Sequence, residues 1–296
     1  MRREHVVSRI RRGGVAALGM LALCGASLSG SPALGYVETT VTDGGSVTGR
    51  VRLDGPPPPS RIFHLVFSPN MAFCGKVSDG AGNRLLREFR VGQDGGFEGV
   101  VVAVVGVEKG KAFTYMPELQ IEHCRIAPFI MPVRNGHPLS MINKDDITHD
   151  IQAYSMREDF AIEMFNKPMI PNARAEKAIR MRKGHYVFHT QCGVHDFMQS
   201  WGIAVGNPYF AVTAADGTFS IPDLQPGQYD VIAWHPHLPV QSGRVTVSAQ
   251  GKATVDFAFN AKDVAIPLHD QQQRYRLDTA LDARPMPIPT VERQVQ

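Results

Sequence analysis

A cysteine, a histidine and a methionine follow one another at three-residue steps, as Cys192, His195 and Met198. A further histidine, His149, comes upstream, directly after a polar run at 143–146. A thiolate, two imidazoles and a weak axial thioether together are the donor set of a mononuclear copper site. The sequence therefore predicts that these four side chains hold one metal ion. The methionine favours copper over zinc, which a Cys-His-His set alone would also suit.

Three alternatives concern the same stretch. A binuclear copper centre needs two cysteines in the loop, and only Cys192 is present, so that site is disfavoured. His189 is a candidate extra ligand, but the strand pleat sets its direction, and we expect it to be solvated or hydrogen-bonded. The third alternative is a β-sandwich without metal, in which Cys192, His195 and Met198 are ordinary core residues. The occurrence of all four donor types in order favours the metal site.

The elements that must position these residues read as short strands. Residues 148–154 are expected to form a short strand that carries His149, residues 186–188 lead up to Cys192, and residues 201–205 form a closing strand. Short strands joined by turns at this spacing favour an antiparallel sandwich, and we expect an all-β protein.

Two smaller patterns complete the middle of the chain. Phe160, Ala161, Met164 and Phe165 fall on one face at helical spacing, which predicts a short helix. The stretch 235–237 reads His-Pro-His without a cysteine or carboxylate nearby in sequence. Such a pair is more typical of a solvated loop than of a second metal site, and the same applies to the lone histidines at 123 and 137.

The N-terminus is typical of an export signal. Five arginines precede an apolar run at 15–28, and small residues follow at 33–35, so residues 1–35 are predicted to be a signal peptide. The alternatives are an uncleaved membrane anchor, a twin-arginine signal at Arg11-Arg12, and a lipoprotein signal ending at Cys24. We expect a periplasmic or otherwise extracytoplasmic protein, with membrane attachment only if the signal is uncleaved or lipidated.

Charge and composition exclude other classes. The predicted signal carries five arginines and one glutamate, so its removal changes the formal net charge from +3 to −1. No basic patch with interleaved aromatic residues remains to bind nucleic acid. The chain has no Gly-x-Ser-x-Gly elbow and no phosphate-binding loop, and the sequence therefore predicts a protein that is not an enzyme.

Cysteine usage also fits an exported protein. Outside the predicted signal three cysteines remain, which is enough for one disulfide and one further thiol with a separate role. We expect a Cys74–Cys124 disulfide, with Cys192 reserved for the metal. The alternative is that Cys74 and Cys124 are buried free thiols.

At this point two resemblances can be stated. Residues 121–206 resemble a cupredoxin domain of the plastocyanin and amicyanin family, whose Greek-key β-sandwich carries one histidine after a polar turn and three ligands on a single loop. The Cys-x2-His-x2-Met spacing is similar to the compact amicyanin loop, which implies a type 1 copper held by His149, Cys192, His195 and Met198. Asp150 stands where cupredoxins often have asparagine.

The region 207–260 resembles the carboxypeptidase regulatory-like, transthyretin-like β-sandwich, an accessory module. Its signs are the Asp216-Gly217 hairpin signal and the strand before Trp234. The strand at 45–53 resembles the first strand of that family, so the segment 36–120 is expected to pack partly with 207–260. Residues 261–296 are predicted to be a polar, proline-rich tail.

Together these resemblances imply a one-electron carrier. Its partners would be a c-type cytochrome or a periplasmic redox enzyme, docking near an exposed edge of His195. The alternative is copper binding without electron transfer, in a chaperone, a storage protein or a cell-envelope binding module.

Overall fold

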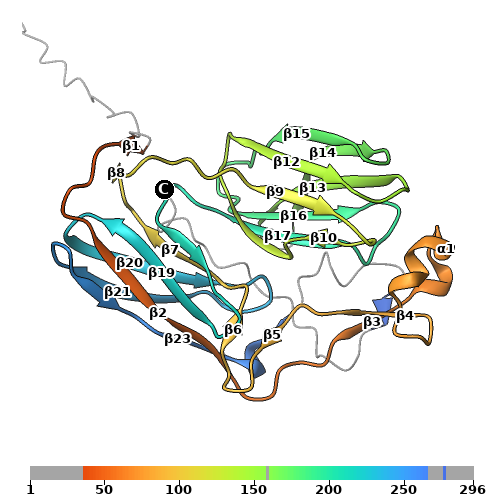
Figure 1. Ribbon diagram of the computed structural model, residues 1–296, viewed down its shortest axis with the longest axis horizontal. Coiled ribbons are helices and arrows are strands. Elements are labelled where there is room, and N and C mark those ends of the chain that lie inside the picture. The colour runs from red at the N-terminus through yellow and green to blue at the C-terminus, as the bar shows by residue number, and fades with distance from the viewer. Residues whose placement is uncertain (1–35, 158–159, 266–275, 278–296) are drawn as a thin grey trace, which may run out of the picture. The chain divides into compact units, whose positions relative to one another are not determined.

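The computed structural model describes residues 36–157, 160–265 and 276–277 (Figure 1). The predicted signal and most of the predicted tail lie outside these residues. The all-β prediction is confirmed, since the one α-helix described is the four-residue α1 (Met71–Cys74). Short 3₁₀ turns occur at η1 (Leu65–Phe67), η2 (Gly75–Val77) and η3 (Ala261–Asp263). No helix within the described ranges has the length and apolar character needed to cross a membrane.

Two sheets form a central sandwich between residues 118 and 204. One sheet has the order β10 (Ile126–Ala127), β9 (Glu118–Ile121), β12 (Pro138–Asn143) and β15 (Arg174–Ala178). The other has the order β11 (Ile130–Val133), β17 (Gln199–Ala204), β16 (Val187–Cys192), β13 (His149–Arg157) and β14 (Phe160–Met169).

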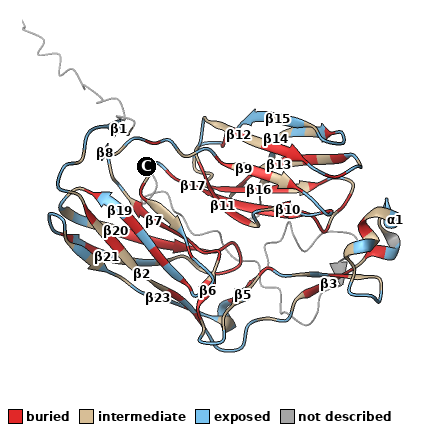
Figure 2. Ribbon diagram, in the orientation of Figure 1, coloured by how far each residue is buried: buried red, intermediate tan, exposed pale blue. Residues whose placement is uncertain are grey.

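The core of the central sandwich lies between these sheets. Leu119 of β9, Met141 of β12, Ile151 of β13 and Phe188 of β16 are all fully buried in it. Burial alternates along most of β13, as expected for a strand with one face on the core. Figure 2 shows β16 and β17 largely buried and the edge strand β15 largely exposed. Each buried side chain such as Ile151 contributes about 1.5–3 kcal/mol by leaving water.

The predicted short helix at 160–165 is wrong. Residues 160–169 are the strand β14, which pairs antiparallel with β13 and places Met169 opposite His149. The register shifts between Ala153 and Tyr154, so β13 has an irregularity near its middle. Pairing with β13 gives the backbone groups on one side of the segment hydrogen-bond partners, and four apolar residues at helical spacing do not outweigh it.

Eight further strands form an outer sandwich, whose strands come from before and after the central sandwich in sequence. One sheet has the order β18 (Phe210–Val212), β7 (Val101–Val105), β20 (Gly227–Trp234) and β21 (Gln241–Val247). In the other, β2 (Gly45–Asp54) pairs with β19 (Thr218–Leu224), β22 (Lys252–Thr254) and β23 (Phe257–Asn260). Because β2 and β7 belong to this sandwich, the range 36–120 does not form a unit of its own, and the central sandwich is inserted within the outer one in sequence.

A third feature is the cap segment, residues 61–86. It contains β3 (Arg61–His64), η1, α1, η2 and β4 (Asn83–Leu86), and β3 pairs with β4 and with β24 (Arg276–Leu277). A disulfide joins Cys74 of α1 to Cys124 of the central sandwich.

Two further pairs of short strands lie outside the cap segment. They are β1 (Val37–Glu38) with β8 (Lys109–Gly110), and β5 (Arg90–Val91) with β6 (Phe97–Glu98).

Candidate metal centre

Three of the four predicted ligands converge at one end of the central sandwich. His149 opens β13, Cys192 ends β16, and His195 lies on the loop that follows. All three are fully buried. His149 Nδ1 lies 3.2 Å from His195 Nδ1, and Cys192 Sγ lies 3.5 Å from His195 Nδ1 and 3.8 Å from His149 Nδ1.

These separations fit one metal ion at the centre of the triangle. Nitrogen ligands about 2.0–2.1 Å and a sulfur ligand about 2.3 Å from an ion, at angles of about 105–120°, are about 3.2–3.8 Å apart. The three measured distances fall within that span. The donor set and its spacing therefore suit a trigonal N₂S site.

Asp145 orients the first histidine. Its carboxylate lies 2.9 Å from His149 Nε2, and Asp145 is 3% exposed. A histidine that donates its Nε2–H to a carboxylate presents the lone pair of Nδ1, here toward Cys192 and His195. Asp145 also accepts hydrogen bonds from the backbone N–H groups of His123 at 2.6 Å and Cys124 at 2.8 Å.

Hydrogen bonds of a buried side chain stabilise the turn that carries Asp145. The buried Asn143 side chain donates to the carbonyls of Ile147, Met169 and Ile170 and accepts from the backbone N–H of Asp145.

A second group of possible metal donors, Cys124, Asp145 and His149, is also closely spaced. It is no separate site, because Cys124 is in the disulfide and both Asp145 oxygens already accept hydrogen bonds.

Backbone contacts tie the two ligand-bearing segments together. The Asp150 N–H points to Cys192 Sγ at 3.4 Å, and the Gly193 N–H donates to the Asp150 carbonyl at 2.8 Å. An N–H aimed at the sulfur favours a thiolate. Since both contacts use only the backbone of residue 150, they do not need the asparagine that cupredoxins often have there.

The protonation states follow from burial. Burial lowers the pKa of His149, although Asp145 opposes this shift. Burial, and then the neighbouring His149, lower the pKa of His195 to about 4, so both imidazoles are neutral near pH 7. Burial raises the pKa of the Cys192 thiol, so a cation is needed to hold the thiolate at this position.

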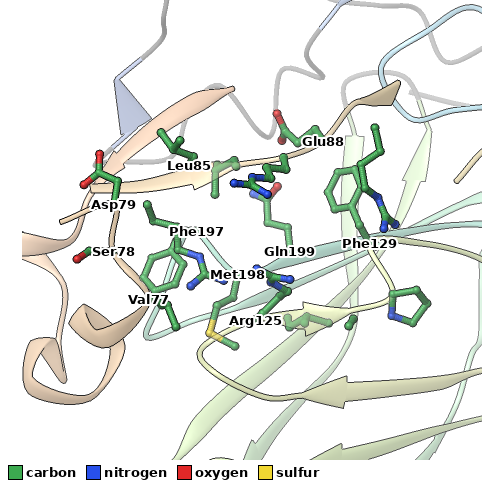
Figure 3. A pocket seen from close by; sticks show the side chains of 17 residues that line it. Val77, Ser78, Asp79, Leu85, Glu88, Arg125, Phe129, Phe197, Met198 and Gln199 are labelled. Carbon is green, nitrogen blue, oxygen red and sulfur yellow. The ribbon is translucent and has the colours of Figure 1, made fainter. Parts of the chain in front are cut away.

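Met198 ends the loop close to the other ligands in the backbone. Its N–H donates to the His195 carbonyl at 2.9 Å, and its carbonyl accepts from Cys192 N–H at 3.1 Å. Its side chain is 1% exposed and lines a pocket together with Phe197 (Figure 3). The structure thus brings the donor atoms of His149, Cys192 and His195 into one triangle. Met198 contacts two of these residues through its backbone.

The cap segment covers His195. Residue 195 is fully buried, the Pro69 backbone contacts its ring, and Phe197 beside it packs on Phe63 of β3 with ring centroids 4.9 Å apart. Phe63 and Leu65 belong to the same apolar cluster as Cys192 and Met198. The expectation of an exposed His195 edge is therefore wrong, because the cap adds a layer that the loop spacing does not reveal.

His189 lies outside the triangle, as expected, whereas the histidines at 235 and 237 differ from expectation. His189 is fully buried and lies with its ring centroid 4.1 Å from that of Trp201. It is three residues from Cys192 on β16, and residues an odd number of positions apart point to opposite faces of a strand. His235 and His237 are also fully buried and pack around Phe89, so the prediction of a solvated loop is wrong.

Comparisons with known proteins give partial likenesses. Residues 182–255 match the family model described as polysaccharide lyase family 4, domain II. A search of curated proteins gave no match. Among solved structures, a purple cupredoxin from Nitrosopumilus maritimus is 18% identical with a TM-score of 0.25, covering 30% of this chain and 98% of that chain.

Two further solved structures match a similar share of this chain. Amicyanin from Paracoccus versutus is 13% identical with a TM-score of 0.25, covering 31% of this chain and 84% of that chain. A copper-containing nitrite reductase from Thermus scotoductus is 12% identical with a TM-score of 0.26, covering 35% of this chain and 25% of that chain. Each of these three likenesses covers about a third of this chain.

Sequence reasoning missed Asp145 as the residue that orients His149. It lay in a run interpreted only as a polar turn, and its position four residues before a candidate ligand was the available signal. The cap residues Phe63 and Pro69 had no comparable signal, because more than 100 residues separate them from His195 in the chain.

Proposed function

We propose that this chain is a mononuclear copper protein that carries single electrons outside the cytoplasm. The observation that carries this proposal is the triangle of His149 Nδ1, His195 Nδ1 and Cys192 Sγ, with sides of 3.2, 3.5 and 3.8 Å. Copper, when bound there, supplies a couple that gains or loses one electron. In this proposal His149, Cys192 and His195 would hold a type 1 copper, and the thioether of Met198 would be its fourth, weakly bound ligand.

The residues of the chain supply rigidity to that site. Asp145 fixes the ring of His149, and the Asp150 N–H is directed at the sulfur of Cys192. Burial keeps water away from the donors. A donor set held in one arrangement needs little rearrangement when the charge of the centre changes, and this is what an electron carrier requires.

Three related expectations belong to the same proposal. The outer sandwich is an accessory module of the carboxypeptidase regulatory-like kind and has no catalysis of its own, so the chain is not an enzyme. The leader directs export to the periplasm or an equivalent compartment, which the Cys74–Cys124 disulfide supports. The partners are a c-type cytochrome or a redox enzyme of that compartment.

The test is spectroscopic and compares three proteins. Full-length chain with Cu(II) should give an intense thiolate-to-copper absorption band and narrow copper hyperfine splitting in the EPR spectrum. Cys192→Ser should lose both, whereas His123→Asn, a change at an exposed histidine outside the triangle, should keep both. A colourless wild-type protein, or a Cys192→Ser spectrum equal to that of wild type, would overturn the proposal.

One observation favours a second function, copper binding without electron transfer. His195 is fully buried under the cap, so none of the three triangle residues reaches the surface. A chaperone or storage protein would shield its metal in this way. Rapid electron self-exchange of the loaded protein supports the carrier, whereas slow self-exchange with rapid transfer of Cu(I) to an acceptor protein supports the second function.

A further inference from the structure

A pocket of about 510 Å³ opens beside the candidate metal centre. Its walls come from the end of the cap segment and the residues just after it, from residues 125–129, and from the loop that ends at Met198 (Figure 3). Pockets of 300–1,000 Å³ are the usual size for small-molecule ligands. The pocket is called the arginine pocket below because Arg84, Arg87, Arg90 and Arg125 line it.

The two carboxylates in the wall are committed elsewhere. Asp79 accepts hydrogen bonds from the backbone N–H groups of Ala81 at 2.8 Å and Asn83 at 3.0 Å within its own turn. Glu88 is 8% exposed and forms a two-point ion pair with the buried Arg61. Neither carboxylate forms an ion pair with an arginine of the pocket in the described part of the chain.

Among the arginines, one is neutralised and three are not. Arg90 Nη1 lies 2.7 Å from a carboxylate oxygen of Glu98. Across residues 36–157, 160–265 and 276–277, no ion pair is formed by Arg84, Arg87 or Arg125. Within the described part of the chain, three arginines of the pocket that contains Met198 therefore have no ion-pair partner.

Arg84 is the unusual member of the set. It is 6% exposed, and its guanidinium lies 5.3 Å from the centre of the Phe197 ring. Its one hydrogen bond to the described chain is from Nη1 to the His123 carbonyl at a long 3.4 Å. Burial, and then Arg125, lower the pKa of Arg84 to about 10, although the nearby Asp145 carboxylate opposes this shift, so Arg84 still carries its charge near pH 7. A buried charge without a counter-ion is costly in a folded protein.

We propose that the arginine pocket binds a small ligand bearing an oxyanion, either a carboxylate or a phosphate. Guanidinium groups bind both through paired N–H donors, and an oxyanion would give Arg84 the direct ion-pair partner that it lacks among the described residues. Arg87 and Arg125 are exposed and would close on the ligand from the rim. This site stands apart from the proposed copper function, since none of the three arginines is among the donors of the triangle.

The test is calorimetric titration of the full chain at low salt, with citrate and with inorganic phosphate in separate experiments. Saturable binding of at least one is expected. Arg84→Gln should weaken it about tenfold or more, and Arg125→Gln, at an exposed position, several-fold. Arg174→Gln is the matched control, because it removes one charge from the exposed edge strand β15, which contributes no residue to the pocket.

Each outcome has one meaning. Binding of citrate alone, phosphate alone or both supports the proposal and identifies the oxyanion that fits. If circular dichroism shows that Arg84→Gln unfolds the protein, the ligand affinities of Arg125→Gln and Arg174→Gln are compared instead, and only the first should be weakened. The proposal is overturned if neither ligand gives saturable binding, if neither pocket variant weakens it, or if Arg174→Gln weakens binding as much as they do.

Discussion

The Asp145 carboxylate lies 2.9 Å from His149 Nε2, and both side chains are buried. The same carboxylate accepts the backbone N–H groups of His123 and Cys124. Because Cys124 is joined to the cap by the disulfide, one carboxylate links the cap attachment, the turn at 143–147 and the candidate metal ligand His149. The orientation of His149 therefore depends on three separate parts of the chain.

Replacing Asp145 should weaken metal binding without removing a ligand. Asp145→Asn loses the charge and leaves one oxygen for three donors, so the His149 ring loses its fixed orientation. Changes at such orienting partners lower metal affinity about 10–100-fold. Competition for Cu(II) with a chelator measures the effect, and Asp146→Asn, at the exposed neighbouring position, is the control. Equal copper affinities of the two variants would contradict the role of Asp145.

Removal of the disulfide should loosen the cap. Cys74 and Cys124 are 50 residues apart in sequence, and a cross-link over such a loop contributes about 2–4 kcal/mol to the free energy of unfolding. Urea unfolding of the double variant Cys74→Ala, Cys124→Ala should show a loss of that size. Carbethoxylation of His195, followed by mass spectrometry of the metal-free protein, should also become faster than in wild type. An unchanged rate at His195 would show that the disulfide does not keep the cap closed.

The buried His235 should make the protein sensitive to mild acid. Burial, and then the nearby His237, lower its pKa well below the usual value near 6.5. The unfolded chain therefore binds a proton at a pH where the folded protein does not. The stability linked to His235 is fully present above about pH 6.5 and is lost as the pH falls below that value toward the lower folded pKa.

His235→Phe tests this expectation. The phenyl ring fits among Phe89 and Phe97 and cannot bind a proton, although the hydrogen bond from Nε2 to the Glu88 carbonyl is lost. The free energy of unfolding should fall less between about pH 7.5 and about pH 5 in the variant than in wild type. His123→Asn, at an exposed site, should keep the wild-type slope, and an equally steep slope in His235→Phe would refute the prediction.

Gly217 should tolerate no side chain. Its φ is +80°, and a Cβ would lie 2.2 Å from the Val51 carbonyl oxygen and 2.8 Å from the Phe97 nitrogen. Gly80 has a similar φ of +87° but nothing within 4 Å of a Cβ. Gly80→Ala should therefore cost only about 1–2 kcal/mol of backbone strain, and Gly217→Ala should cost at least about 2 kcal/mol more. Thermal or urea unfolding of the two variants measures the difference, and equal losses would contradict it.

The sequence alone determined the elements and the donor types. The spacing of short strand-like segments between turns predicted a strand at 148–154, and Asp216-Gly217 predicted the turn between β18 and β19. The order of Cys192, His195 and Met198 predicted a ligand loop, and the structure brings two of these three residues to His149. These features are local, because side-chain period, turn chemistry and loop spacing are properties of neighbouring residues.

Only the tertiary structure decided what surrounds the donors. The cap over His195, the carboxylate of Asp145 on His149 and the buried position of His235 all depend on segments brought together by strand pairing and a cross-link. The helical spacing at 160–165 was overridden in the same way, since β13 offered β14 a full ladder of backbone partners. Burial and charge pairing are properties of the folded surroundings, and a residue's type does not specify which distant segment will cover it.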